Sequence, residues 1–318
     1  MINLGYTLSS EEHRPNDLIA NGQRAEAAGF EFLSISDHFH PWLDSQGQSS
    51  FVWSTLGGLA QATSTIRVGT GVTCPTIRIH PVIVAQAVAS VADMFEGRFY
   101  FGVGSGENLN EHVTGEHWPP VSVRQDMLRE AIGLLRTLWQ GKYTTEHGQY
   151  FTVENARIYT LPETLPEIIV AASGPDAAQL AAEIGDGIDS TSPDQELIQT
   201  FEQHGGKGSR YGQMTVCYGP DEQAATELAL KQWANAAIPG QLGQELALPL
   251  YFEQAAQLVT AEQIGQEIVC GPDPARYHAK IQEFADAGFT HLYIHQVGPD
   301  QAAFIDFAGR ELVPAHRQ

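Results

Sequence analysis

The chain has 318 residues, of which 42% are hydrophobic and 17% are charged. This length and this balance are typical of a globular protein that buries a substantial apolar core. The 17 Lys and Arg residues stand against 38 Asp and Glu residues, and the resulting formal net charge of −21 argues against nucleic acid or an anionic membrane as a partner.

Two units near the ends of the chain predict a repeated helix-to-strand pattern. Residues 2–6 are expected to form a strand, and Asn16 is expected to cap the helix that follows. Gly29 closes that helix, and residues 30–35 alternate as a second strand. The same junction returns near the other end of the chain at Gly288, which indicates a fold built by repeating one unit.

The interval between these units alternates helices and strands without a break in composition. Further strands are expected at residues 66–73, 99–103, 168–171, 188–190, 214–218 and 292–295. Helices are expected at residues 53–63, 82–95, 124–139 and 176–184. Eight strands that alternate with helices predict an α/β protein, a (β/α)8 TIM barrel. A doubly wound open sheet is the alternative.

We expect a single domain over residues 1–318, with two insertions into the barrel pattern. Residues 143–161 hold a turn at Gly148 between two alternating segments, which predicts a hairpin. Residues 234–262 are rich in Gln, Ala and Pro and show a mixed helical pattern, so we interpret them as a helical insertion.

The three cysteines lie far apart and show no CxxC spacing. They indicate neither a disulfide framework nor a zinc site, and a reducing compartment fits best. The first residues lack the basic lead of a signal peptide, and no apolar run approaches the ~20 residues that span a bilayer. We therefore expect a soluble, cytoplasmic protein with no membrane partner.

An acid, two imidazoles and an indole follow the second predicted strand, at Asp37, His38, His40 and Trp42. Parallel α/β folds keep their active sites at the carboxyl ends of their strands, so these side chains are candidates for catalysis. Asp37 is also consistent with a simple turn cap, and a lone histidine more often has a structural role.

Asp37, His38 and His40 are also of the residue types that bind metals. A metal hydrolase on this barrel would need further His or Asp after the fifth and sixth strands, where the chain has Ala, Ser and Thr. We therefore predict no metal site and favour a redox function.

Two further loops that follow predicted strands are rich in small residues. Gly102–Gly106 lacks the third glycine of a dinucleotide-binding loop and is followed by Glu107, so we interpret it as a tight loop that lets a flat ligand approach the backbone. Ser173 and Gly174 leave backbone N–H groups free before Pro175 begins a helix, whose N-terminus favours a phosphate. Ordinary turns are the alternative for both loops.

Several side chains expected around these loops are apolar or aromatic. Tyr6 comes at the end of the first predicted strand, Trp42 after the second and Val72 at the end of the third. With few charges among them, they suit a planar conjugated cofactor better than a sugar polyphosphate.

The segments at residues 36–42, 102–111 and 172–175 together resemble the bacterial luciferase-like superfamily, in the branch that contains deazaflavin-dependent glucose-6-phosphate dehydrogenase. The resemblance extends over nearly the whole chain. It implies a TIM barrel whose C-terminal mouth holds FMN or the deazaflavin coenzyme F-420, commonly in a homodimer. It also implies a small-molecule substrate and, for an FMN enzyme, a separate reductase as a partner.

The resemblance also implies roles for individual residues. By position, His38 and Glu107 are the implied proton-transfer groups, and Trp42 is the implied wall of the substrate site. The bond between Gly71 and Val72 is the implied non-proline cis peptide behind the cofactor ring. The residues implied to bind the cofactor are Asp37, Gly71, Val72, Ser105, Gly106, Asn110, Ser173 and Gly174.

The chain departs from the dehydrogenase of this branch where that enzyme holds its sugar phosphate with cationic side chains. The matching positions carry Pro193-Asp194, Gln266 and Ala302-Ala303. A dianionic substrate would find no counter-charge there, so we predict that glucose 6-phosphate is not a substrate.

A side branch of the superfamily, proposed to use an ordinary flavin, shares features at Gln46–Ser49, Asn110–His112 and Gly298–Phe307. The expected function is therefore a flavin-dependent oxidoreductase that transfers hydride to or from a small organic substrate, with FMN favoured as the cofactor. A deazaflavin-dependent dehydrogenase is the first alternative. A flavin-binding protein without turnover is the alternative of another class.

Overall fold

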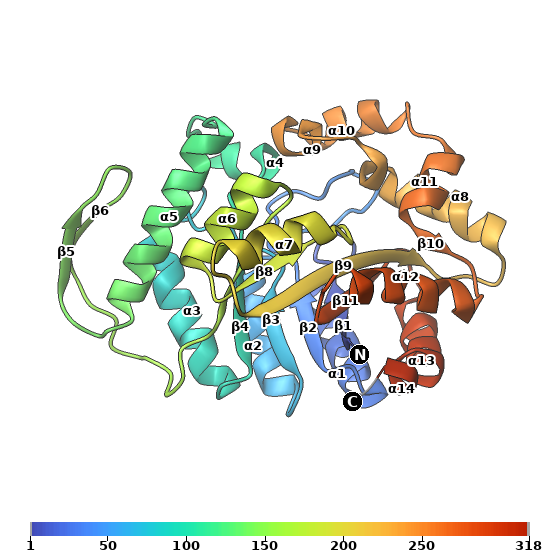
Figure 1. Ribbon diagram of the computed structural model, residues 1–318, viewed down its shortest axis with the longest axis horizontal. Coiled ribbons are helices and arrows are strands. Elements are labelled where there is room, and N and C mark those ends of the chain that lie inside the picture. Colours follow the sequence, from blue (N-terminus) through green and yellow to red (C-terminus); the bar gives the residue numbers. More distant parts are fainter. Residues whose placement is uncertain (1, 317–318) are drawn as a thin grey trace.

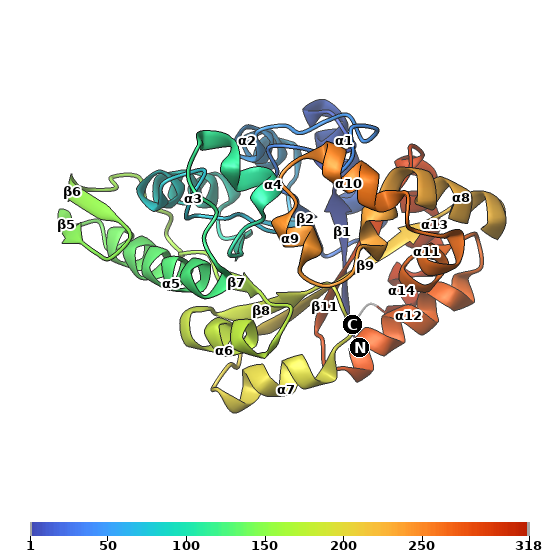
Figure 2. The same ribbon diagram turned by 90° about the horizontal axis from the view of Figure 1, so that it is seen from above.

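A computed structural model describes residues 2–316, and residues 1, 317 and 318 of the predicted domain lie outside that range. Within residues 2–316, eight parallel strands pair in a closed ring with helices outside it (Figures 1 and 2). In ring order they are β1 (Asn3–Leu8), β2 (Phe32–Ile35), β3 (Arg67–Thr70), β4 (Phe99–Val103), β7 (Ile168–Ala171), β8 (Gly187–Ser190), β9 (Ser209–Cys217) and β11 (His291–Gln296). The TIM barrel is confirmed, and the open sheet is excluded.

Helices that return the chain from one strand to the next cover the outside of the barrel (Figure 2). They are α1 (Pro15–Ala28), α2 (Val52–Ala62), α3 (Pro81–Phe95), α5 (Val121–Leu138), α6 (Pro175–Ile184), α7 (Gln195–Gln203), α12 (Pro274–Asp286) and α13 (Gln301–Glu311). The periodicity that predicts these helices is visible in α5, where Leu128, Ile132 and Leu135 are buried on one face. Shorter segments are α4 (Asn108–Glu111), η1 (His112–Thr114) and α14 (Val313–His316).

Two segments depart from the simple alternation of strand and helix. A hairpin of β5 (Thr144–His147) and β6 (Thr152–Ala156) extends beside α5, where the Glu130 carboxylate accepts backbone N–H groups from the hairpin turn. Between β9 and α12 the chain forms α8 (Glu222–Trp233), η2 (Ala234–Ala237), α9 (Leu242–Glu245), α10 (Pro249–Ala256), α11 (Ala261–Glu267) and β10 (Val269–Cys270). Figures 1 and 2 show α9 and α10 over the carboxyl end of the barrel. We call this segment, residues 218–269, the mouth insertion.

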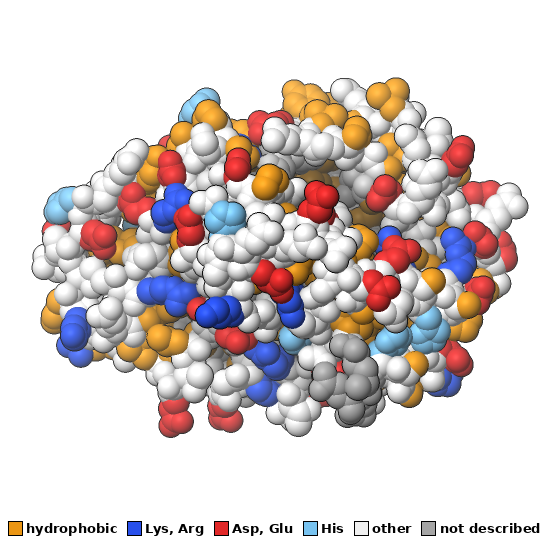
Figure 3. All heavy atoms as spheres, viewed as in Figure 1, with side chains coloured by type: hydrophobic (Ala, Val, Ile, Leu, Met, Phe, Trp, Pro, Cys, Tyr) orange, Lys and Arg blue, Asp and Glu red, His pale blue; other side chains and the backbone are white. Residues whose placement is uncertain are grey.

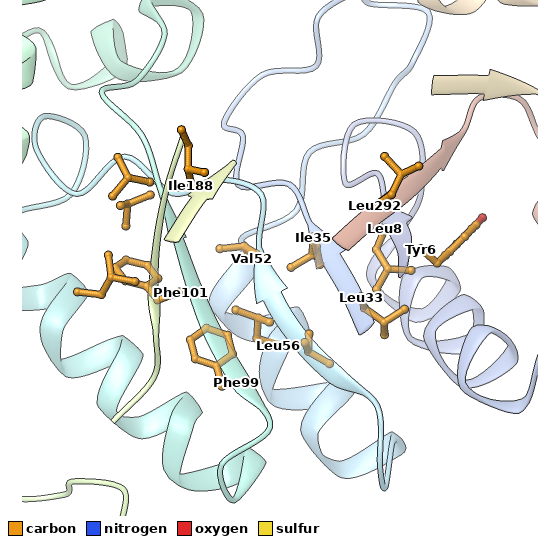
Figure 4. Packing of buried hydrophobic residues seen from close by; sticks show 14 of the residues in the cluster. Tyr6, Leu8, Leu33, Ile35, Val52, Leu56, Phe99, Phe101, Ile188 and Leu292 are labelled. Atoms are coloured by element: carbon orange, nitrogen blue, oxygen red, sulfur yellow. The ribbon is translucent and has the colours of Figure 1, made fainter. Parts of the chain in front are cut away.

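The core has an inner and an outer part. Inside the barrel, Phe32, Tyr100, Ile169, Tyr211 and Tyr293 pack together. The outer part lies between the strands and the helices, and Figure 4 shows side chains of β2 directed towards Val52 and Leu56 of α2. None of the described helices is long and apolar enough to cross a membrane.

Tyr6 belongs to the outer core and does not line the mouth, so that prediction is wrong. β1 continues to Leu8, two residues beyond the predicted end, so that Tyr6 is a strand residue. Its ring is fully buried between Phe30 and Phe304, and its hydroxyl donates to Gln301 Oε1. The alternation of β1 therefore directs this side chain outward from the barrel.

We expect Tyr6→Phe to lower the free energy of unfolding by about 1–3 kcal/mol, because Gln301 Oε1 is then buried without a donor. Denaturant titration followed by circular dichroism measures this change. Tyr143→Phe is the control, since Tyr143 is 67% exposed and its hydroxyl pairs with that of Tyr159 at the surface. Equal losses in the two variants would contradict a buried hydrogen bond at Tyr6.

Candidate active site

The loops after β1, β2 and β4 place one imidazole between two carboxylates. His38 Nδ1 lies 3.3 Å from Glu11 Oε1, and His38 Nε2 lies 3.6 Å from Glu107 Oε2. The indole of Trp42 packs against the imidazole at a centroid distance of 5.0 Å. These contacts bring together three predicted residues, His38, Glu107 and Trp42, with one that sequence reasoning missed, Glu11.

Glu11 is the ionised partner of the imidazole. Burial alone would raise its pKa, but the facing His38 and the hydroxyl donors Ser36 and Ser9, at 2.7 and 3.0 Å, outweigh burial and hold the pKa of Glu11 below its ordinary value. The carboxylate of Glu11 and the carbonyl oxygen of His40, at 3.3 Å, are both acceptors near His38 Nδ1. The hydrogen of a neutral His38 therefore sits on Nδ1, and Nε2 presents its lone pair towards Glu107.

Glu107 is the carboxyl group next to His38 Nε2. Burial raises its pKa to about 6, although the nearby His38 acts in the opposite direction. Asn110 Nδ2 lies 3.4 Å from Glu107 Oε2, and the Asn110 Oδ1 accepts the backbone N–H groups of Phe39 and His40. Asn110 thus joins the loop after β2 to the loop after β4. An acid with a pKa near neutrality beside an imidazole lone pair suits general acid–base chemistry.

Asp37 is anchored by protein groups on both of its oxygens. Thr73 Oγ1 donates to one oxygen at 2.8 Å, and Arg78 Nη2 donates to the other at 2.8 Å. The backbone N–H of Arg78 donates to Glu111 Oε2 at 2.7 Å, and burial raises the pKa of Glu111 to about 7 against the opposing charge of Arg78. Asp37 is therefore part of a buried ion-pair group, and its contact with a cofactor stays a prediction.

The peptide bond between Gly71 and Val72 is cis, as predicted. A Cβ on Gly71 would approach Ser34 Oγ to 2.1 Å, so a larger residue here would displace that hydroxyl of β2. Gly106 has a φ of +85°, and a Cβ there would meet Cys74 Sγ at 2.7 Å. Packing within the protein thus favours glycine at both positions, whatever ligand they face.

Ser173 and Gly174 lie at the start of α6 and leave room beside its first turn. No side chain caps this helix, and a Cβ on Gly174 would meet no atom within 4 Å. The first N–H groups of α6 have no partner within the helix, so the site fits the phosphate of a cofactor. Asp176, in the same turn, acts against an anion and limits the strength of the site.

A second acid–imidazole pair lies beside the first. His295 Nε2 is 3.2 Å from Glu12 Oε2, and the Trp233 ring packs against His295 at 4.4 Å. His295 was expected at the end of the last strand, but it lies inside β11 and is only 2% exposed. Among the described residues, no group of three His, Cys, Asp or Glu could hold a metal ion.

The missed residues Glu11 and Glu12 have a sequence signal that the predicted end of β1 concealed. They follow β1 at a distance of three and four residues, but the shorter predicted strand assigned them to a remote loop. Arg78 and Glu111 have no such signal, because their meeting depends on the paths of two loops.

The mouth insertion covers the site and contacts both of its sides. Trp42 packs against Phe252 of α10 at 5.1 Å, and Asn108 Nδ2 donates to the Glu245 carbonyl of α9 at 2.9 Å. Figure 3 shows a hollow beneath the apolar side chains on α9 and α10. Trp42 therefore connects the imidazole of His38 to α10 of the mouth insertion.

A family model described as luciferase-like monooxygenase matches residues 2–291. The F420-dependent glucose-6-phosphate dehydrogenase of Beutenbergia cavernae is 35% identical over 330 aligned positions, which cover 100% of this chain and 98% of that protein.

Solved structures show the same likeness. An F420-dependent secondary alcohol dehydrogenase in complex with an F420-acetone adduct has a TM-score of 0.93 at 33% identity, with 100% of both chains covered. The coenzyme F420-dependent tetrahydromethanopterin reductase from Methanopyrus kandleri has a TM-score of 0.80 at 20% identity, with 99% of both chains covered. The second likeness shows the fold alone.

The Glu107→Gln variant tests the raised pKa of Glu107 through the pH dependence of the free energy of unfolding. The folded-state pKa of about 6 lies above the ordinary 4.5, so the contribution of Glu107 to stability is complete below pH 4.5 and is lost as the pH rises through 6. A glutamine stays neutral, so we expect the variant to gain about 1 kcal/mol relative to the parent between pH 4.5 and about pH 7. This is less than the full shift, because the side chain is 30% exposed and solvent screens it.

Denaturant unfolding at the two pH values measures the gain. Glu116→Gln, at an exposed site, controls for the removal of one negative charge. Parallel pH curves for the parent and Glu107→Gln would contradict the raised pKa.

Proposed function

The chain belongs to the luciferase-like monooxygenase family, and from this we propose that it is an F420-dependent oxidoreductase acting on the carbinol of a small uncharged alcohol, or on the matching ketone. The support from relatives is the 33% identity and the TM-score of 0.93 with an F420-dependent secondary alcohol dehydrogenase. Curated relatives that are F420-dependent dehydrogenases add to this support. The sequence alone favours FMN, but with this support from relatives we prefer the deazaflavin.

The observation that carries the proposal is the position of His38 between Glu11 and Glu107. In this proposal His38 Nε2 accepts the hydroxyl proton of the alcohol while Glu11 stabilises the imidazolium that forms. Glu107, with a pKa of about 6, then takes the proton and returns it in the reverse direction. The bound F420 supplies the hydride acceptor. A protein that only stored a cofactor would have no use for this pair.

Trp42 and the α6 N-terminus complete the proposed arrangement. Trp42, held between His38 and Phe252, forms the wall of the substrate site and excludes water from it. The first turn of α6, with Ser173 and Gly174, holds the cofactor phosphate. The loop glycines and the Gly71–Val72 bond form the floor of the site.

The charges around His38 support an uncharged substrate. Glu11, Glu12, Asp37 and Glu107 lie in the loops of the mouth, and Glu111 ends α4 beside them, where these carboxylates would repel an anion. The guanidinium of Arg78 is already paired with two of these carboxylates, those of Asp37 and Glu111. This agrees with the prediction, from three regions of the sequence that lack Lys and Arg, that glucose 6-phosphate is not a substrate.

Titration with F420 and with FMN, followed by absorbance and fluorescence, tests the cofactor. We expect F420 to bind, and reduction of F420 at about 420 nm to follow addition of 2-propanol but not of glucose 6-phosphate. His38→Ala should lower turnover by about 10²–10⁴-fold and leave the F420 affinity within about threefold. His147→Ala, on the exposed β5, is the control and should change neither quantity.

Each other outcome has a definite meaning. Binding of FMN alone would replace the proposal with the flavin enzyme, which would then need a reductase. Binding of F420 without turnover of any secondary alcohol would favour a cofactor-binding protein. Turnover of glucose 6-phosphate would contradict the uncharged substrate.

We also propose that two copies of the chain associate through α2 and α3. A groove on these helices is lined by Phe51, Trp53, Ile79, Ile83 and Ala87, and none of the described residues that line it is charged. Phe51 and Ile83 are 56% and 55% exposed, and Trp53 Nε1 is buried without a partner. Because each copy carries a net charge of −21, an uncharged face is where two copies meet with least repulsion.

Ile83→Glu should convert the dimer to a monomer in sedimentation velocity at micromolar concentration, because the change buries two facing carboxylates. Leu258→Glu is the matched control, since Leu258 is 82% exposed on the mouth insertion and should leave the mass unchanged. A parent chain that sediments as a monomer would contradict the proposal.

A further inference from the structure

Cys217 and Cys270 are register partners on neighbouring parallel strands. Cys217 ends β9, Cys270 ends β10, and the two are paired in the ladder directly after Val216 and Val269. Neighbouring strands lie about 4.8 Å apart, which is within the Cα separations of about 4.4–6.8 Å found in disulfides. The sequence shows these cysteines as remote, and only the fold brings them together.

Both thiols point to the same side of the strands. The two side chains are buried in one apolar cluster, with Ala225 and Ala229 of α8 and Ile264 of α11. The backbone also holds the two strand ends together, because the N–H of Gly271 donates to the Cys217 carbonyl at 3.0 Å. The two thiols are therefore neighbours on one side of the ladder, and the Cys270 thiol also pairs with the side chain of Thr226.

The pair stands at the two ends of the mouth insertion. The chain leaves the barrel after Cys217, passes through α8 to α11, and returns at Cys270 (Figures 1 and 2). Between these points the insertion contributes Trp233, which packs on His295, and Phe252, which packs on Trp42. A covalent bond between the two ends would therefore fasten the segment that covers the site.

Both thiols are protected while the insertion is closed. Cys217 and Cys270 are 0% and 2% exposed, and burial raises the pKa of Cys217 to about 12 and also raises that of Cys270. Because the thiolate is the reactive form, oxidation needs a transient opening of the insertion and is slow. Once formed, the disulfide is shielded from reductants by the same burial.

We propose that Cys217 and Cys270 form a reversible disulfide that fastens the mouth insertion over the site under oxidising conditions. Two S–H bonds break and one S–S bond forms. The two electrons and two protons pass to hydrogen peroxide, which is reduced to two molecules of water. The inference rests on strand register and does not depend on the identity of the cofactor or substrate.

Incubation of the full chain with hydrogen peroxide tests the pair. Trypsin cuts after Lys231, so Cys217 and Cys270 fall in the separate peptides 211–231 and 232–276. We expect mass spectrometry to find these peptides joined, and dithiothreitol in denaturant to separate them. Cys74→Ser is the matched control, because Cys74 is also buried and its removal should leave the link unchanged.

The link should also change the behaviour of the insertion. We expect thermolysin to cut within residues 218–269 about tenfold more slowly after oxidation, and the melting temperature to rise by about 5 °C. Cys217→Ala and Cys270→Ala, which bury no new polar group, should each lose both responses to peroxide relative to the same variant before treatment. Sulfinic acid at either cysteine without a joined peptide would overturn the disulfide. A joined peptide without slower digestion would overturn its fastening role.

Discussion

The parallel pairing of β11 with β1 is the constraint on which the site depends. It joins the last strand of the ring to the first, with Leu292 opposite Leu4 and Ile294 opposite Tyr6. In the closed barrel the carboxyl ends of all strands point to one face. Residues that are far apart in the sequence, such as Glu12 and His295, therefore meet there. A slip of one residue in this ladder would turn the apolar face of β1 towards the wrong side.

The closed ring brings together two glutamates whose pKa values are shifted in opposite directions. Glu11 receives two hydroxyl donors and an imidazole, and its pKa is held down. Glu107 receives a single amide at 3.4 Å, and burial raises its pKa to about 6. Groups whose environments separate their pKa values in this way are suited to distinct roles as stabilising anion and proton carrier. The imidazole of His38 connects the two.

The mouth insertion completes the site from a different part of the chain. The hydrogen bond from Asn108 to the Glu245 carbonyl holds it on one side of the mouth, and the contact of Trp42 with Phe252 holds it on the other. Its two ends leave and rejoin the barrel side by side, at β9 and β10. The insertion therefore moves independently only if contacts at the mouth are lost, which ties access to the site to the packing around Trp42.

The sequence by itself determined the order of strands and helices, the position of Asp37, His38 and Trp42 after β2, and the cis bond at Gly71, because these follow from periodicity, local order and a resemblance carried by short motifs. The end of β1 could not be predicted, since polar residues that a strand buries at the mouth look like a loop. The pairing of Glu11 with His38, of Arg78 with Glu111, and of Cys217 with Cys270 was decided only by the tertiary structure. The residues of each pair are far apart in the sequence, and their positions in the sequence do not predict that they are close in space. Barrel closure and strand register bring them together.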